Sequence, residues 1–533
     1  MRPTRRPPPA ANQPAEPALN LLDRAIAWVA PRTAARRLVA REQLSLMGGY
    51  SGARRDRASL AGWRTRVGSP ETDVIADLDT LRQRCADLER SAPVGAAVIN
   101  TNVLHVVGTG LACNPQLDAA LLRLSPEQAT AWEGDVKRRF RIWAASVDCH
   151  LSRHLNFYGL QDQVLRGTLS RGDIFTISPR VHRNGRDRLA LQLIEADRVA
   201  NPLGKPNDNV LTEGIEHDAT TGEALRYHVL DHHPGDLRNA GRTGQWIDAR
   251  GQATGRRNVL HSFRQTRPEL RRGVPILAPV IEPIKQITRY TEAELEAAVV
   301  AGLFAVFLKM DPQAFQDLFD DPSQDAIVAH AKEWSGEIEG GKAINLLPGE
   351  EPIPSNPGRP NAQFDPFVQA CMRQIGMALS IPYEVLVMHF QSSYSAAKGA
   401  LLMAWRCWMG WRDWMATSWC QPVYELWLAD EVAEGRVPAP GFFADPLLRA
   451  AWCGATWVGD GPGSLDPKKD VDAAEARINL RISTLEAESL ALDGVDWETK
   501  HRQAVKETAA SKAAGFVDGR LEQPPAPPAD PPA

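Results

Sequence analysis

The chain of 533 residues lacks the marks of a disulfide-bonded or membrane-spanning protein. Its seven cysteines are an odd number with no Cys-x-x-Cys pair, so we expect no disulfide framework and a reducing compartment. The longest apolar run, residues 297–307, is about half as long as the ~20 residues that a membrane span needs. The amino terminus is rich in Arg and Pro and has no apolar segment typical of a secretory signal. We therefore expect no transmembrane helix and no membrane partner.

Signatures of catalysis and of metal binding are also missing. The sequence contains no Gly-x-Ser-x-Gly elbow, no His-Glu-x-x-His pair and no paired-carboxylate motif. Residues 336–342 resemble a phosphate-binding loop, but Ala343 stands where a Ser or Thr hydroxyl must bind Mg²⁺. Cys149, His150 and His154 could share one helix face, yet no fourth metal ligand is evident. We predict that the chain is not an enzyme and that it needs no metal or cofactor.

The chain has no basic coat of the kind found on proteins that wrap nucleic acid, since its net charge is −4. The charge is uneven, however. Residues 1–66 contain thirteen Arg, no Lys and four acidic residues, a net charge of +9, which leaves −13 for the remainder. This basic arm could bind DNA phosphates or dock on the acidic surface of a partner, and the sequence leaves both alternatives open.

Residues 171–265 differ from the segments on either side. Four short runs rich in β-branched and aromatic residues are separated by turn residues, among them an Asn-Gly pair. This pattern predicts a small antiparallel barrel or sandwich. Before it, the spacing of apolar residues predicts helices over 69–100 and 125–170, and residues 96–107 favour either a strand or a buried helix end.

Long helices are expected after the β-rich region, over residues 277–309 and 363–380, and from the end of a Ser-rich loop (389–398) to about residue 430. The fold class is therefore α+β. The last of these helices contains five tryptophans at spacings that form a broad stripe: Trp405, Trp408, Trp411, Trp414 and Trp419. Such a stripe fits either a helix packed in a large core or a helix at a subunit interface, where aromatic residues concentrate.

Four blocks of sequence, in a fixed order, resemble the portal proteins of lambda-type tailed bacteriophages. They are NTNVLHVVGTGL (100–111), the segment 272–307 that opens with Arg-Gly-Val-Pro, residues 364–402, and residues 465–503. The chain departs from the usual family pattern at two places. Ser380 precedes Ile-Pro-Tyr where the family often has Gly before Pro-Tyr, and Ser-Tyr-Ser-Ala-Ala-Lys (393–398) replaces the usual Asn-Tyr-Ser-Ser-Ala-Arg.

The resemblance implies a portal fold with long helices in its stem, wing and crown and a small antiparallel barrel or sandwich in the wing. By order along the chain it predicts these parts: a basic, largely flexible arm (1–59), the wing (60–275), a stem helix (276–309), the clip (310–362), a second stem helix (363–386), a tunnel loop (387–398), a wing helix and connector (399–463), the crown (464–510) and a disordered Pro/Ala tail (511–533).

The resemblance also implies a ring, usually of twelve subunits, at one vertex of the capsid in the virion, after assembly in the cytoplasm of a bacterial host. Double-stranded DNA would pass through the ring during packaging and ejection. The expected partners are further copies of the chain, the terminase large subunit, head-completion or adaptor proteins, scaffold and the major capsid protein. A portal of a gene transfer agent or of a defective prophage is the alternative. A packaging nuclease or ATPase is a remote one.

Two sets of site residues follow from this mapping. Those expected to approach DNA in the tunnel loop are Gln391, Ser392, Ser393, Tyr394, Ser395 and Lys398. Those expected at the contact between subunits are Trp405, Trp408, Trp411 and Trp414.

Overall fold

The computed structural model describes residues 67–310, 350–354 and 363–521, except for short gaps at 184, 237, 239–242, 304–305, 390–392, 463–465, 496, 515 and 518–519, together with residues 26, 28–33, 36 and 37. The chain divides into two compact units, residues 1–68 and 69–533, and the second contains all the elements below. Most of the basic arm, the segment 336–343 and most of the expected clip lie outside the described residues.

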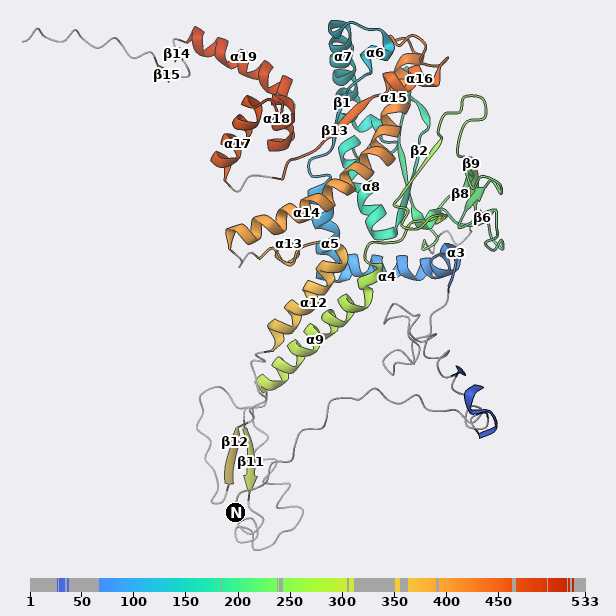
Figure 1. Ribbon diagram of the computed structural model, residues 1–533, viewed down its shortest axis with the longest axis vertical. Helices are drawn as coiled ribbons and strands as arrows, with labels where there is room; N and C mark the ends of the chain where they lie inside the picture. The colour runs from blue at the N-terminus through green and yellow to red at the C-terminus, as the bar shows by residue number, and fades with distance from the viewer. Residues whose placement is uncertain are drawn as a thin grey trace, which may run out of the picture. The chain divides into compact units, whose positions relative to one another are not determined.

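Helices make up the first part of the second unit (Figure 1). They are α3 (Pro70–Asp73), α4 (Leu78–Ser91), α5 (Pro93–Val106), α6 (Ala119–Leu122), α7 (Pro126–Ala145) and α8 (Phe157–Arg171). The single helix predicted over 69–100 is wrong, because Pro93 lacks an amide hydrogen and starts a new helix instead. Of the two interpretations of residues 96–107, the buried helix is the one observed, with Val98 and Ile99 fully buried in α5.

Small antiparallel sheets follow, as the turn-separated runs predict. One sheet has the order β10-β2-β5 and another the order β6-β7-β8-β9. The strands are β2 (Asp173–Ile177), β5 (Gln192–Glu195), β6 (Leu211–Thr212), β7 (Ile215–His217), β8 (Ala224–Leu230), β9 (Gly244–Asp248) and β10 (Val259–Phe263), and a hairpin joins β3 (Arg180–Arg183) to β4 (Arg186–Leu189). Buried side chains of both sheets share one small core, and neither strand order closes on itself, so the described strands form two open sheets and not a closed barrel.

Two helices that contact each other, α9 (Ile281–Leu303) and α12 (Phe364–Leu379), occupy the expected stem segments. The helix predicted to residue 309 is too long. Val306–Met310 forms β11, which pairs with β12 (Glu350–Pro354). The second stem helix is also shorter than the predicted 363–386, because Ser380 adopts a left-handed conformation and Pro382 precedes the separate α13 (Tyr383–Leu386).

A long helical segment returns through the main core. It consists of α14 (Tyr394–Met415), a π-helical turn (Ala416–Cys420) and α15 (Gln421–Ala433). After α16 (Pro446–Trp452), β13 (Ala455–Val458) pairs with β1 (Ala112–Pro115). The last described elements are α17 (Pro467–Asn479), α18 (Leu485–Asp493), α19 (Trp497–Ala513) and the short paired strands β14 (Phe516–Val517) and β15 (Arg520–Leu521). A disordered tail predicted from residue 511 onward therefore begins too early, because α19 and this strand pair extend the ordered part to Leu521.

One large apolar cluster joins α4, α5, α7, α8, α14 and α15. All seven cysteines are free. Within the described residues, no helix combines the length and the apolar character that crossing a bilayer requires.

Candidate functional site

The first candidate site is a cluster of buried charges where β2 begins. The carboxylate of Asp173 is fully buried and accepts hydrogen bonds from Arg272 Nε at 2.6 Å and from Arg82 Nη2, on α4, at 3.0 Å. The ring of His261, on β10, lies 3.1 Å from the same carboxylate. Burial alone would raise the pKa of Asp173, but Arg272 and Arg82 outweigh it and hold that pKa well below its usual range. The charged carboxylate therefore ties α4, β2, β10 and residue 272 together.

This cluster explains the Arg-Gly-Val-Pro motif. The amide of Gly273 also donates to Asp173, at 3.2 Å. A Cβ on Gly273 would overlap the carbonyl of Gly172, so glycine is required where these two backbone segments cross. Helix α9 begins at Ile281, eight residues beyond this crossing. The cluster, called here the stem joint, therefore fixes the point from which the chain leaves the sheets toward α9.

A second joint lies at the Gly-Thr-Gly turn (108–110) that ends the first resembling block. Asp460, between β13 and α17, accepts hydrogen bonds from Thr109 N and from Thr109 Oγ1, both at 2.9 Å. Gly108 has a φ of +55°, and a Cβ there would meet the Asp460 carboxylate. Arg412, on α14, donates to the carbonyl of Asp460 at 2.9 Å and to two carbonyls at the end of α5. These contacts join α5, α14 and the connection to α17.

Helix α14 carries the four tryptophans that the sequence places at a subunit contact: Trp405, Trp408, Trp411 and Trp414. Trp408 is buried and stacks on His105 with ring centroids 3.9 Å apart. The indole N–H of Trp414 donates to the carbonyl of Phe263 at 3.2 Å. The other two indoles are half-buried. Packing within the chain therefore accounts for Trp408, and the role of the four at a contact between subunits stays a prediction.

The loop before α14 is shorter than the predicted 387–398. Of its six candidate residues, the structure does not describe Gln391 and Ser392, and it places Ser393, Tyr394, Ser395 and Lys398 at or after the start of α14. Ser393 occupies the N-cap position, and Ala396 and Ala397, both good helix formers, follow in the first turn. The helix therefore starts at Tyr394, inside the segment that was predicted to be a loop.

Lys398 is not a bare cation at the end of a loop. Its ammonium group lies 3.6 Å from the carboxylate of Asp470 on α17. A lysine beside a carboxylate attracts a phosphate less than an unpaired one does, so Asp470 weakens any contact of Lys398 with DNA, and that contact stays a prediction.

Helices α14 and α17–α19 enclose an apolar cleft of about 680 Å³, called here the α14 cleft. Its aliphatic and aromatic lining consists of Leu401, Leu402, Trp405, Trp408, Val471, Ile478, Leu485, Leu492 and Trp497. Lys398 and Asp470 also line it. Two of the four predicted contact tryptophans therefore face this cleft.

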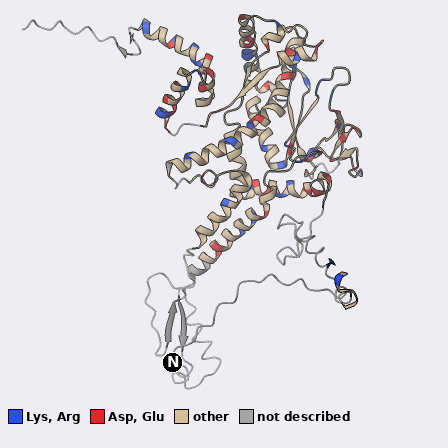
Figure 2. Ribbon diagram, in the orientation of Figure 1, with Lys and Arg blue, Asp and Glu red and all other residues tan. Residues whose placement is uncertain are grey.

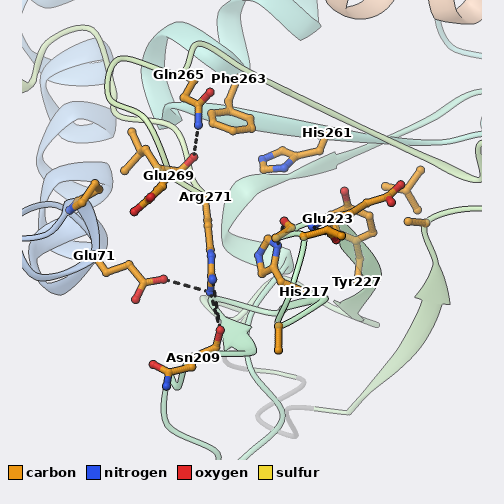
Figure 3. Close-up of a pocket in the computed structure, with 18 of the residues that line it drawn as sticks. Glu71, Asn209, His217, Glu223, Tyr227, His261, Phe263, Gln265, Glu269 and Arg271 are labelled. Carbon is orange, nitrogen blue, oxygen red and sulfur yellow. Dashed lines mark hydrogen bonds and ion pairs between the residues drawn. The ribbon is translucent and has the colours of Figure 1, made fainter.

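A polar cavity of about 920 Å³ lies between α3, the β6–β9 sheet and the segment after β10 (Figure 3). Arg271 reaches into it and is paired with Glu71 at 3.2 Å and with the carbonyl of Asn209 at 3.2 Å. His217 Nδ1 lies 3.2 Å from the carbonyl of Gly222, which fits donation by Nδ1–H. Burial lowers the pKa of His217 to about 4, so the ring is neutral at pH 7. The cavity can accept and donate hydrogen bonds, and we assign no catalytic step to it.

The candidate metal ligands are not brought together. Among the residues that the structure describes, no group of His, Cys, Asp and Glu side chains could hold a metal ion. Cys149 is buried, and burial raises the pKa of its thiol to about 12. The rings of His150 and His154 are in edge contact, with centroids 6.4 Å apart.

The sequence reasoning missed the charged residues of both joints: Arg82, Asp173, Arg412 and Asp460. Asp173 gave one usable signal, because a single acidic residue directly after Gly172 opens an otherwise apolar strand. Arg412 gave another, as a charged residue inside the tryptophan stripe. A buried charge needs a partner that compensates it. Asp173 and Arg412 therefore each predict such a partner, but the sequence does not show which residue it is.

Comparison with protein families matches residues 56–412, about two thirds of the chain, to the family described as phage portal protein, lambda family. Portal protein B of Escherichia phage lambda is 24% identical over 501 residues, which cover 89% of this chain and 91% of that protein. The portal protein of Escherichia phage N15 is 23% identical over 495 residues, which cover 88% of this chain and 90% of that protein.

Among solved structures, the chain is similar to one in the neck of a native gene transfer agent (GTA) particle. The identity is 12%, the TM-score is 0.37, and the match covers 70% of this chain and 93% of that one. A similarity of this size adds nothing to the assignment made from sequence.

Proposed function

The chain belongs to the lambda family of phage portal proteins, and we propose that about a dozen copies of it form a closed ring at one vertex of a phage head. The family is one of structural proteins, not enzymes, in agreement with the missing catalytic signatures. The ring is then a component of the virion and the conduit for double-stranded DNA in packaging and ejection. Its proposed partners are the terminase large subunit, head-completion proteins, scaffold and the major capsid protein. The family match over residues 56–412 carries this proposal.

Charge on the α9–α12 pair supports a role in conducting DNA. The exposed face of α9 carries Glu282, Glu292 and Glu296 against the cations Lys285 and Arg289, and Figure 2 shows these charges along the helix. If α9 and α12 line the channel as stem helices, phosphates meet a surface with more acidic than basic groups. Such a surface repels DNA weakly, whereas a basic groove would bind it tightly. DNA can then slide instead of sticking.

The segment before α14 is the proposed tunnel loop. Because Lys398 is paired with Asp470, contact with the DNA backbone falls to the uncharged residues 391–395. These would form transient hydrogen bonds and supply no fixed positive charge. If Ser393→Ala leaves both packaging and retention of DNA unchanged, this role of the loop is wrong.

The ring itself is tested by negative-stain electron microscopy of the purified full chain, with native mass measured in parallel. Rings of about a dozen subunits with a central hole are expected. A monomer that stays monomeric after addition of scaffold and coat protein from the same particle would contradict the proposal. Matched samples of Trp405→Ala and Trp411→Ala then test the proposed subunit contact, because loss of ring mass with an unchanged circular dichroism spectrum indicates a role between subunits and not within one.

A further inference from the structure

Several aliphatic side chains that line the α14 cleft are about half exposed to solvent. Leu402 on one wall is 52% exposed, and on the opposite wall Val471 is 50% and Leu485 is 52% exposed. Single exposed apolar side chains are ordinary, but a group of them around one cavity marks a place where something binds. The tryptophans Trp405 and Trp497 add broad flat faces to the same cleft.

The chain itself supplies a segment that can reach this cleft. Trp497, which lines it, is the first residue of α19, so the cleft lies at the amino-terminal end of that helix. After α19 the chain reverses, because β15 pairs antiparallel with β14 and Leu521 lies opposite Phe516. Leu521, the last described residue, therefore lies close to the carboxyl end of α19, and the distance back along the 17 residues of that helix is about 25 Å. Twelve residues in a polyproline II conformation span about 37 Å, which is enough.

The composition of this segment suits an apolar cleft. Residues 522–533 read EQPPAPPADPPA, and six of the twelve are proline. Proline has no amide hydrogen, so between residues 524 and 529 only the two alanines carry an amide that needs a partner. Most sequences would leave several unpaired amides in such a cleft. A polyproline II helix also loses little entropy on binding, and aromatic side chains are its usual contacts in proteins.

We propose that residues 522–533 lie in the α14 cleft of their own chain as a polyproline II helix, with prolines against Trp405 and Trp497. The segment then covers the exposed aliphatic side chains and links the end of the chain to α14. Charge contributes little, since the lining balances three cations against three anions: Lys398, Arg477 and Lys500 against Asp470, Glu475 and Glu488. Trp405 is also one of the four tryptophans proposed at the contact between subunits, but the crosslink reports on the tail alone, so failure of this proposal leaves the portal role standing.

Site-specific photo-crosslinking of the full chain tests this placement. A benzophenone amino acid at Leu402 should crosslink to residues 522–533 within one chain, so the product keeps the monomer mass in a denaturing gel and is mapped by mass spectrometry. The matched control places the same group at Met403, the next residue of α14, which is 72% exposed and does not line the cleft. We expect at least a tenfold lower yield of tail crosslinks from position 403.

Two further samples keep the test informative. Replacing the four prolines 524, 525, 527 and 528 by Ala should abolish the crosslink from Leu402 while the melting temperature stays unchanged. Because a short tether gives an effective concentration in the millimolar range, a synthetic peptide of residues 522–533 at about 1 mM should halve the crosslink yield, and its Pro-to-Ala version should not. A crosslink from Leu402 to other residues, a crosslink to a second copy of the chain, or no crosslink at all would overturn the proposal.

Discussion

Replacing Asp173 by Asn should destabilise the protein more than any surface change, because it removes the charge of the carboxylate to which both buried arginines of the stem joint donate hydrogen bonds. The amide has the shape of the carboxylate, so packing is kept. Two buried guanidinium groups, those of Arg82 and Arg272, lose the charge of the carboxylate that they share, and the new amide offers one acceptor oxygen where the carboxylate offered two. Removing one partner of a buried ion pair costs about 3–5 kcal/mol. Since domains are stable by only about 5–15 kcal/mol, Asp173→Asn approaches global unfolding.

Equilibrium unfolding in urea, followed by circular dichroism at fixed protein concentration, measures this loss as a shift of the midpoint. The control is Asp187→Asn, whose exposed carboxylate is paired with His182 at 2.8 Å. Such surface pairs contribute about 0–1 kcal/mol. Adding Arg82→Met to Asp173→Asn should recover part of the loss, because one uncompensated charge is removed. A loss below about 1 kcal/mol for Asp173→Asn, or no recovery in the double variant, would refute the buried-charge argument.

Three other predictions concern the glycines, His261 and the charges of α9. Gly273→Ala should lower the free energy of unfolding by about 1–3 kcal/mol, because the new methyl group overlaps the backbone of residue 172. Gly399→Ala lies in open space on α14 and should raise the free energy of unfolding by about 0.5–1 kcal/mol. Urea midpoints measure both changes. Burial lowers the pKa of His261 from 6.5, so at acidic pH the unfolded chain takes up a proton there that the folded chain does not. The free energy of unfolding should therefore fall as the pH drops below 6.5. In His261→Gln this dependence on pH should be flatter. The double variant with Glu292→Lys and Glu296→Lys should slow DNA packaging in a salt-dependent manner, because lysines in a channel wall attract phosphates. The double variant with Gln at both positions should have a smaller effect. Equal packaging rates for the Lys variant and the wild type would argue against α9 as channel wall.

Local patterns in the sequence predicted the elements that local interactions determine. The four β-rich runs became β2, β5, β8 and β10, because strand composition and turn residues act over a few positions. The end of α9 was misplaced for the opposite reason. Val306–Met310 continues an apolar run that suits a helix, and only its pairing with Glu350–Pro354, some forty residues later, makes it a strand. The start of α14 was misplaced because Ser393 was read as loop and not as a helix cap.

The charged contacts of the two joints could not have been predicted from local patterns. Arg82, Asp173 and Arg272 are each about ninety or more residues apart, and Thr109 is 351 residues from Asp460. No periodicity relates residues at such separations. The sequence shows only that a charge sits in an apolar setting, and the fold decides which partner compensates it.

The short motifs that carried the family resemblance act as mechanical connections. Arg-Gly-Val-Pro supplies a buried guanidinium to Asp173 and a glycine that lets two backbone segments cross. Gly-Thr-Gly supplies a left-handed turn and two hydrogen-bond donors to Asp460. The first motif precedes α9 and the second holds the connection to α17, so each lies where a separate helical part leaves the main core. Glycine at a crossing and a buried charge both resist substitution, since neither a larger residue nor a neutral one fits. In the proposed ring, where helices must keep fixed positions around a passage, these joints and not a pocket would then be the places least tolerant of substitution.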